Sequence, residues 1–466
     1  MQTFIFTVLG RLMQERGQYY MNSAISKDLT QPNLDDELNN LEEAHCIAET
    51  VVVPGLLGYI PIGKDNPLCI KRSPRDPDLL AVGGLDDSIY FVEAKGSAGD
   101  FEVPMSLLVT FEGVHSDSVT SLVFSHDGKY LFSAGMDGIV NCFDVEEQRL
   151  ISYVEGPASI EWMEIHRKGN VLLVGAEDGN SWIFDFSKDP KRPETFAIFT
   201  GHTGPVTCGG FSTNAKRVIT GSQDSTIRMY DPLTRDCLSK VQLPSPVTCL
   251  KITKSMTQCT ATQHANKVTV ILAGCDDGSF HVISSTDKAL MLVSSNSTHK
   301  GSIEFIQVCA DRYVIIGGID GLISLLDGAM NFSSRFTHQA EAACTQALIA
   351  TSAGESGKDM LAYIGFSNGT WGAFNVLSGE HLLMVDCFPA DLCVQSEENR
   401  PILAMELLRN DKIVVSGDKS VSVWSGKRSL YLEQENNTSM HNTDTDTDPE
   451  SSGELGDHAL GQLGKL

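Results

Sequence analysis

The chain has 466 residues, of which 41% are hydrophobic and 20% are charged, a composition that excludes general disorder. Its formal net charge is −25, from 60 acidic against 35 basic residues, and a field of this sign repels nucleic acids and anionic membranes. The twelve cysteines include no Cys-x-x-Cys pair, which argues against a disulfide scaffold or a zinc site and favours reduced core residues.

Residues 1–48 are predicted to form an acidic, largely disordered N-terminal segment. From Asp28 to Gly63 there are seven acids and neither Lys nor Arg. The apolar run at residues 4–9 is short, has no basic residue before it and lacks a cleavage pattern, so it does not predict a signal peptide, and no run is long enough to span a bilayer. We therefore expect a cytoplasmic protein, with the nucleus as a further location, and either Met1 or Met21 can be the start.

One short phrase recurs eight times after this segment: an apolar run, a Gly, an Asp or Asn, and a second apolar run. A period of about 40–50 residues with several short strands per unit is typical of a β-propeller blade. The sequence therefore predicts an all-β propeller over residues 49–432, with eight blades and with seven as the alternative. The turn residues of the phrase lie 41 to 53 positions apart and are Asp86, Asp137, Asp178, Asp224, Asp277, Asp320, Asn368 and Asp418.

Two of the repeats carry a further pattern in which a His precedes a small hydroxyl residue by 18 positions and the turn Asp by 22. This spacing resembles the WD-repeat family, whose blades use a chain of hydrogen bonds from His to Ser or Thr, Asp and Trp to tie outer strands to inner ones. His, Ser and Asp together also suggest a hydrolase triad. We interpret these residues as structural, because the set recurs at blade spacing whereas a nucleophile needs one exposed site. The residues are His115, Ser133 and Asp137 in one repeat, His202, Thr220 and Asp224 in another, and Trp424 for the family's Trp in the last.

Ring closure requires one more strand, and two segments are candidates. Glu49 to Val53 would supply it from the N-terminal side, and Ser429 to Leu432 would complete the last blade from its own end. Residues 433–466 are predicted to be an acidic disordered C-terminal tail.

One stretch goes beyond the generic repeat: Ser159-Ile-Glu-Trp-Met-Glu-Ile-His166, followed by Val171-Leu-Leu-Val-Gly-Ala-Glu-Asp-Gly-Asn-Ser-Trp182. It resembles the third blade of the angio-associated migratory cell protein family, and the resemblance extends over about residues 64–428. The resemblance implies an eight-bladed cytoplasmic propeller without enzymatic activity. Fungal members are dedicated chaperones that hold the basic N-terminal segment of a large-subunit ribosomal protein on the negatively charged top of the ring, and animal members are linked to cell migration and signalling.

The acidic charge of the repeats independently favours a basic protein segment as the partner. The expected binding face is built from the loops that enter each innermost strand and from the turns that carry the repeated Asp. The two aromatic candidates on this face would cover the aliphatic stem of a Lys or stack on an Arg. The alternative is that these acids are ordinary solvated surface and the aromatics fill space between blades. The candidates are Asp117, Glu161, Trp162, Glu177, Asp276, Glu304, Phe305 and Glu341.

Two functions therefore stay open, a chaperone of a basic ribosomal protein and a signalling or cell-migration scaffold. An enzyme is not expected, because the chain has neither a nucleophile motif nor a phosphate-cradling glycine loop. We expect no cofactor, no metal, no direct contact with nucleic acid or membrane, and a monomer.

Overall fold

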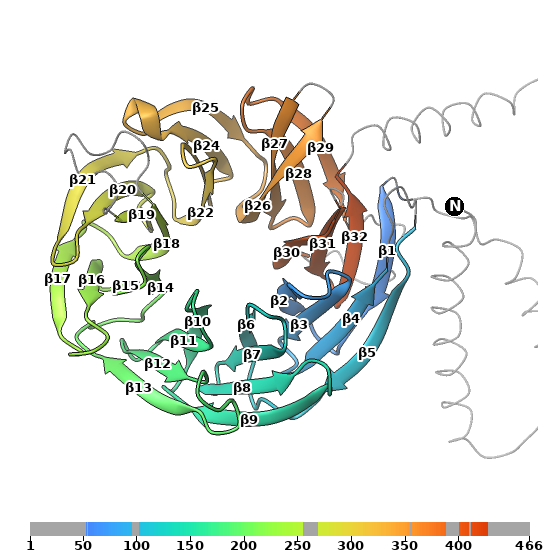
Figure 1. Ribbon diagram of the computed structural model, residues 1–466. Coiled ribbons are helices and arrows are strands. Elements are labelled where there is room, and N and C mark those ends of the chain that lie inside the picture. The colour runs from blue at the N-terminus through green and yellow to red at the C-terminus, as the bar shows by residue number, and fades with distance from the viewer. Residues whose placement is uncertain are drawn as a thin grey trace, which may run out of the picture.

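The computed structural model describes residues 53, 55–95, 102–254, 269–354, 357–387, 400–409 and 412–426, with side chains left out for 351–359. The predicted segments 1–48 and 433–466, the two candidate starts and the candidate strand Ser429 to Leu432 lie outside these ranges. The described chain is a ring of eight four-stranded antiparallel sheets, seen along its axis in Figure 1. The prediction of an all-β propeller with eight blades is confirmed, and the seven-bladed alternative is wrong.

In the first four blades the strands follow chain order from the innermost to the outermost. Blade one contains β2 (Pro67–Arg72), β3 (Leu79–Gly84), β4 (Ile89–Ala94) and β5 (Met105–Phe111). Blade two contains β6 (Val119–Phe124), β7 (Tyr130–Gly135), β8 (Ile139–Asp144) and β9 (Arg149–Glu155). Blade three contains β10 (Ile160–Ile165), β11 (Val171–Ala176), β12 (Ser181–Asp185) and β13 (Glu194–Phe199). Blade four contains β14 (Cys208–Phe211), β15 (Val218–Gly221), β16 (Thr226–Tyr230) and β17 (Cys237–Gln242).

The next three blades follow the same order. Blade five contains β18 (Val247–Lys254), β19 (Thr269–Cys275), β20 (Ser279–Ser285) and β21 (Leu290–Ser297). Blade six contains β22 (Ile303–Cys309), β23 (Tyr313–Gly318), β24 (Leu322–Asp327), the short 3₁₀ turn η2 (Gly328–Met330) and β25 (Ser333–Gln339). Blade seven contains β26 (Cys344–Gly354), β27 (Gly357–Phe366), β28 (Thr370–Asn375) and β29 (His381–Asp386).

Blade eight closes the ring with a strand from the other end of the described chain. Its first three strands are β30 (Ala404–Leu407), β31 (Lys412–Gly417) and β32 (Ser420–Ser425), and its outermost strand is β1 (Leu56–Pro61). The N-terminal alternative is therefore the correct side, but the closing strand is Leu56–Pro61 and not Glu49 to Val53. Leu57 and Ile60 are at most 4% exposed and both pack in the cluster between blades eight and one. The pairing of β1 with β32 is irregular between Leu56 and Gly58, so the two side chains share one face although they are three positions apart.

The hydrophobic core lies between the blades. The described residues form eight buried clusters, each of which joins two neighbouring blades, and the last joins blade eight to blade one. In the cluster between blades two and three, for example, Phe132 packs with Leu172 and Phe184. A blade thus buries its two faces only against its neighbours, and a closed ring of blades leaves no face uncovered.

Candidate functional site

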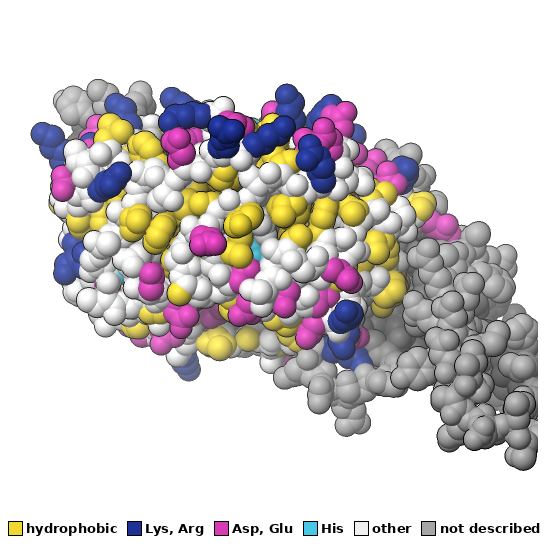
Figure 2. Space-filling view, turned by 90° about the horizontal axis from the view of Figure 1, so that it is seen from below, with side chains coloured by type: hydrophobic (Ala, Val, Ile, Leu, Met, Phe, Trp, Pro, Cys, Tyr) yellow, Lys and Arg dark blue, Asp and Glu magenta, His cyan; other side chains and the backbone are white. Residues whose placement is uncertain are grey.

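One face of the ring is markedly acidic. It is built from the loops that enter each innermost strand and from the turns between the second and third strands of each blade, and we call it the acidic face. Between the strands, its described residues include fourteen Asp or Glu against four Lys or Arg. The connections on the opposite face include twelve acids and fourteen bases among the described residues. Figure 2 shows the ring edge-on, with Lys and Arg gathered along its upper rim and most Asp and Glu below them.

Several turn Asp carboxylates on this face are committed to hydrogen bonds within their blade. Asp137 accepts from the His115 ring (Nδ1 to Oδ2, 3.0 Å) and from the backbone N–H groups of Ser116 and Ile139. The other ring nitrogen, Nε2, accepts from the Ser133 hydroxyl at 2.7 Å. The same arrangement joins His202, Thr220 and Asp224 in blade four, with distances of 2.8 and 3.0 Å. Ser133 and Thr220 are completely buried, so neither hydroxyl is placed to attack a substrate.

Removal of the Asp137 carboxylate is expected to destabilise the ring measurably. Asp137→Ala should lower the free energy of unfolding by about 2–3 kcal/mol, because the buried His115 Nδ1 and a backbone N–H lose their acceptor. Asp178→Ala is the matched control, since Asp178 is exposed and bonds only to Asn180 two residues on. It should cost less than about 1 kcal/mol. Urea unfolding of both variants measures the two costs, and equal costs would contradict a structural role for the buried chain.

Other turn residues accept hydrogen bonds either from residues close by in the sequence or from residues about 20 positions away. Asp277 accepts from the backbone N–H and hydroxyl of Ser279, whereas Asp320 accepts from His299 Nδ1 at 3.1 Å and from two backbone N–H groups. The His299 pair was missed from the sequence because Ile316 stands where blades two and four have Ser or Thr. In blade eight the Trp424 indole N–H donates to the Ser422 hydroxyl on the same strand at 2.7 Å.

The acids adjacent to these turns are exposed and are available to a partner. Among the predicted candidates, all six acids are exposed on the acidic face: Asp117, Glu161, Glu177, Asp276, Glu304 and Glu341. The structure therefore brings them to one side of the ring, but it contains no ligand that touches them. Their role in binding stays a prediction.

Two of these acids stand at the mouth of the central channel, where other blades have Thr. In blades two and five the second residue of the inner strand, and in blade four the residue just before that strand, is a Thr whose hydroxyl donates to a carbonyl of the next blade. Thr120 to Ile160 O, at 2.8 Å, is one such bond. In blades three and six the same position is Glu161 and Glu304, which are exposed. Both glutamates thus line the mouth of the channel, three blades apart around the ring of Figure 1.

Burial and neighbouring acids raise the pKa of two carboxyl groups on the acidic face. Partial burial raises the pKa of Glu161, and the negative charge of Glu177 raises it further. Burial also raises the pKa of Asp87, followed by the charges of Asp117, Asp86 and Asp137. Asp87 was not singled out from the sequence. A cation placed among these groups would relieve their mutual repulsion.

The predicted aromatic contacts are corrected by the structure. Phe305 is 6% exposed and packs in the cluster between blades six and seven, with its ring against Gly317. Trp162 is half-buried, lies against Gly209 of blade four and donates its indole N–H to Val206 O at 2.8 Å. Both rings therefore fill space between blades, as the alternative interpretation expected, because glycines on the neighbouring strands make room for them.

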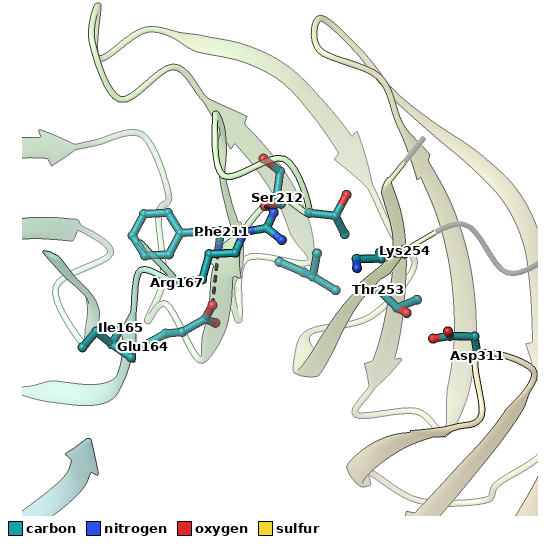
Figure 3. Close-up of a pocket in the computed structure, with 10 residues that line it drawn as sticks. Glu164, Ile165, Arg167, Phe211, Ser212, Thr253, Lys254 and Asp311 are labelled. Atoms are coloured by element: carbon teal, nitrogen blue, oxygen red, sulfur yellow. Dashed lines mark hydrogen bonds between the residues drawn. The ribbon is translucent and has the colours of Figure 1, made fainter. Parts of the chain in front are cut away.

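One further acid, Glu164, is half-buried near the opposite end of the channel. Its carboxylate fills the space left by Gly210 and accepts a backbone hydrogen bond from Phe211 at 3.4 Å (Figure 3). Burial raises the pKa of Glu164 to about 7, although the Phe211 N–H and Lys251 oppose the shift. The folded state therefore binds this proton more tightly than the unfolded chain does.

The variant Glu164→Gln is expected to stabilise the protein in a pH-dependent way. The folded pKa is raised, so the wild-type stability linked to this proton is fully present below the unfolded pKa and is lost as the pH rises to about 7. The variant should gain about 2 kcal/mol over wild type at pH 8 and almost nothing at pH 4. Thermal unfolding across this range measures the gain, and a gain independent of pH would show that the buried charge is not its source.

The described residues contain no group of three or more His, Cys, Asp or Glu arranged to hold a metal ion. In the same part of the chain, no helix is long and apolar enough to cross a membrane.

Comparison with known proteins shows WD40 repeats. The family described as "WD domain, G-beta repeat" matches residues 105–144 and 193–231, each of which spans the outermost strand of one blade and three strands of the next. The angio-associated migratory cell protein of Homo sapiens is 30% identical over 229 residues, which are 49% of this chain and 45% of that protein. The Pongo abelii protein of the same name is 27% identical over 276 residues, 56% of this chain and 58% of that protein. The match thus spans about half the length of these curated relatives.

Solved structures share the fold. Saccharomyces cerevisiae Sqt1 superposes with a TM-score of 0.67 at 20% identity, covering 80% of this chain and 99% of that one. Chaetomium thermophilum Sqt1 bound to the N-terminus of the ribosomal protein L10 gives a TM-score of 0.65 at 18% identity, covering 80% of this chain and all of that one.

Proposed function

We propose that this WD40-repeat propeller is a non-enzymatic chaperone that holds the basic segment of a nascent large-subunit ribosomal protein on its acidic face in the cytoplasm during ribosome biogenesis. The observation that carries the proposal is the pair Glu161 and Glu304, which replaces inter-blade threonines at the mouth of the channel and adds two exposed charges where the acids already outnumber the bases. The proposal is supported by the shared fold of an Sqt1 bound to the N-terminus of ribosomal protein L10.

The acidic face would act through charge rather than through a deep pocket. A cationic segment is steered toward the face over the range of a Debye length, about 8 Å in physiological salt. In the absence of a partner, carboxylates such as Glu161 and Glu177 repel one another. The Lys and Arg groups of a bound segment would lie among them and relieve this repulsion. The turn Asp residues keep the face in shape, because the His115 and His202 networks hold their loops to the inner strands. Binding of this kind should be fast and sensitive to salt.

Titration calorimetry tests the proposal. The full chain is titrated with a peptide of the basic N-terminal segment of ribosomal protein L10, in low and in raised salt. We expect binding in low salt and a loss of affinity of about tenfold or more in raised salt. A peptide in which each Lys and Arg is replaced by Gln serves as the control and should not bind. Equal binding of both peptides, or no binding of the basic one, would sink the proposal and favour a scaffold with other partners.

A further inference from the structure

The face opposite the acidic face carries a cavity of about 380 Å³ between the turns of blades three, four and five (Figure 3). Arg167, Ser212, Thr213 and Lys254 contribute to its walls. Two acids, Glu164 and Asp311, also line it. Glu164 is turned toward the backbone of β14, where it accepts from Phe211, and Asp311 lies at the far edge in Figure 3. Arg167 and Lys254 lie between these two acids in Figure 3.

Four cations around this cavity form what we call the cationic sector: Arg167, Lys168, Lys216 and Lys254. All four are exposed, and within the described residues none of them forms an ion pair. Some other cations of the same face are paired with acids, namely Arg75 with Glu146, Lys188 with Glu194, Arg217 with Asp231 and Arg312 with Asp327. Among the described residues Lys191, Arg192 and Lys288 also form no ion pair, but they do not cluster around a cavity. The cationic sector is therefore an excess of positive charge on a ring that is acidic overall.

The turns that carry the sector are fixed to one another. Arg167 donates to Ser212 O at 3.4 Å, and His166 Nε2 lies 3.4 Å from Ala215 O. The hydroxyls of Thr213 and Thr269 are hydrogen-bonded at 2.7 Å, which ties blade four to blade five. Around Arg167, Lys168 and Lys216 a ligand meets two turns that hydrogen bonds already hold together, so little ordering entropy is lost there on binding.

The described part of the chain ends on this same face, ahead of an acidic segment in the sequence. The turn between β31 and β32 lies on the acidic face, so β32 runs away from it and ends at Ser425 on the opposite face. Residues 444–457 contain six acids, Asp444, Asp446, Asp448, Glu450, Glu454 and Asp457, and no Lys or Arg. Extended chain reaches about 3.4 Å per residue, so residues 427–443 allow a reach of about 60 Å before the first of these acids. Each four-stranded blade measures about 15 Å from inner to outer strand, so a reach of about 60 Å spans two opposed blades and a channel of up to about 30 Å between them.

We propose that the acidic segment 444–457 of this chain docks on the cationic sector of its own ring. Charge complementarity selects the segment, and because the segment and the sector belong to one chain, the effective concentration of one at the other is about millimolar. Single surface pairs are weak, and the docking depends on several carboxylates engaging several cations at once. The docking does not rest on the proposed function. If that function holds, docking keeps six carboxylates on the far side of the ring, where they do not compete with the acidic face for a basic client.

Zero-length coupling of carboxyl to amine groups tests the docking in the full-length chain. The coupled monomer is digested and the linked peptides are identified by mass spectrometry, in low and in raised salt. We expect residues 444–457 to couple to Lys168, Lys216 and Lys254 at least fivefold more often than to Lys64, Lys300 and Lys419, the exposed lysines among the described residues of the acidic face. This preference should be lost in raised salt. Three results would overturn the proposal. They are equal coupling to all exposed lysines, coupling only between separate chains, and coupling of the acids of residues 28–49 in place of those of 444–457.

Charge exchange separates docking from chance proximity. The variant Lys168→Glu, Lys216→Glu, Lys254→Glu removes the amines and with them the preferred links, whether or not the tail docks. It is the blank for the exchange, and its melting temperature should stay unchanged. Adding Asp444→Lys, Asp446→Lys, Asp448→Lys and Glu450→Lys should restore them with the polarity reversed, since lysines on the tail now couple to glutamates on the ring. Failure of the exchanged variant to couple would also overturn the docking. Binding of the basic peptide, measured on the same variants, reports on the proposed function separately.

Discussion

The variant Glu161→Lys, Glu304→Lys is expected to lose most of its affinity for the basic peptide. Each substitution replaces an exposed carboxylate at the mouth of the channel by an ammonium group, so an attraction becomes a repulsion. Together the two changes should cost about 2–3 kcal/mol of binding free energy, since exposed charges contribute little one at a time and like charges brought together cost more. This corresponds to a dissociation constant raised about 30- to 150-fold.

The control for this variant is Glu146→Lys, Asp236→Lys. Both residues are exposed in connections on the opposite face, and the change in net charge is the same. Because long-range attraction falls off within a Debye length of about 8 Å, we expect affinity to fall less than about threefold. Calorimetry of both variants at one salt concentration measures the difference. Equal losses would mean that the net charge of the ring, and not the mouth of the channel, governs binding.

The variant Ile60→Asp is expected to open or unfold the ring. Ile60 is 3% exposed in the closing strand β1, in the cluster that joins blade eight to blade one. An aspartate at this position loses the buried apolar contacts and places a carboxylate among Leu80, Val414 and other apolar side chains of that cluster. We expect a loss of about 3–5 kcal/mol of unfolding free energy, the range of severe core substitutions.

Leu107→Asp is the matched control for the closing strand. Leu107 is also in an outermost strand, β5, but it is 46% exposed. Its substitution should cost less than about 1 kcal/mol. Urea unfolding of the two variants compares them. A similar, small cost for Ile60→Asp would show that ring closure does not depend on β1.

The repeat phrase predicted the architecture because it encodes two local requirements at once. The apolar runs become the buried second and third strands of each blade, and the Asp or Asn between them occupies a tight turn, as Asp137 does in blade two. The spacing of His115 and His202 from their turn Asp residues predicted real hydrogen bonds for the same reason: the interval is set within one blade.

Features that depend on contacts between blades were less accessible from the sequence. Trp162 packs against Gly209 of blade four and Phe305 packs among side chains of blade seven, and no pattern within one repeat indicates such contacts between blades. The closing strand Leu56–Pro61 pairs with a segment more than 350 residues away, so local propensity did not distinguish it from Glu49 to Val53. Asp87 follows the turn residue Asp86 and has a positive φ of 63°. The sequence did not indicate that Asp87 would interact with Asp117 and Asp137 of blade two.

Purification of the tagged full-length protein from cytosol tests the central claim most directly. Wild type, Glu161→Lys, Glu304→Lys and the control Glu146→Lys, Asp236→Lys are compared in low and in raised salt, and the bound proteins are identified with the messenger RNAs that accompany them. The account predicts that one basic large-subunit ribosomal protein and its own message dominate with wild type and with the control, and that both are lost in raised salt and with the Glu161→Lys, Glu304→Lys variant. Recovery of acidic or neutral signalling proteins without ribosomal protein, or a ribosomal protein retained equally by all three forms, would contradict it.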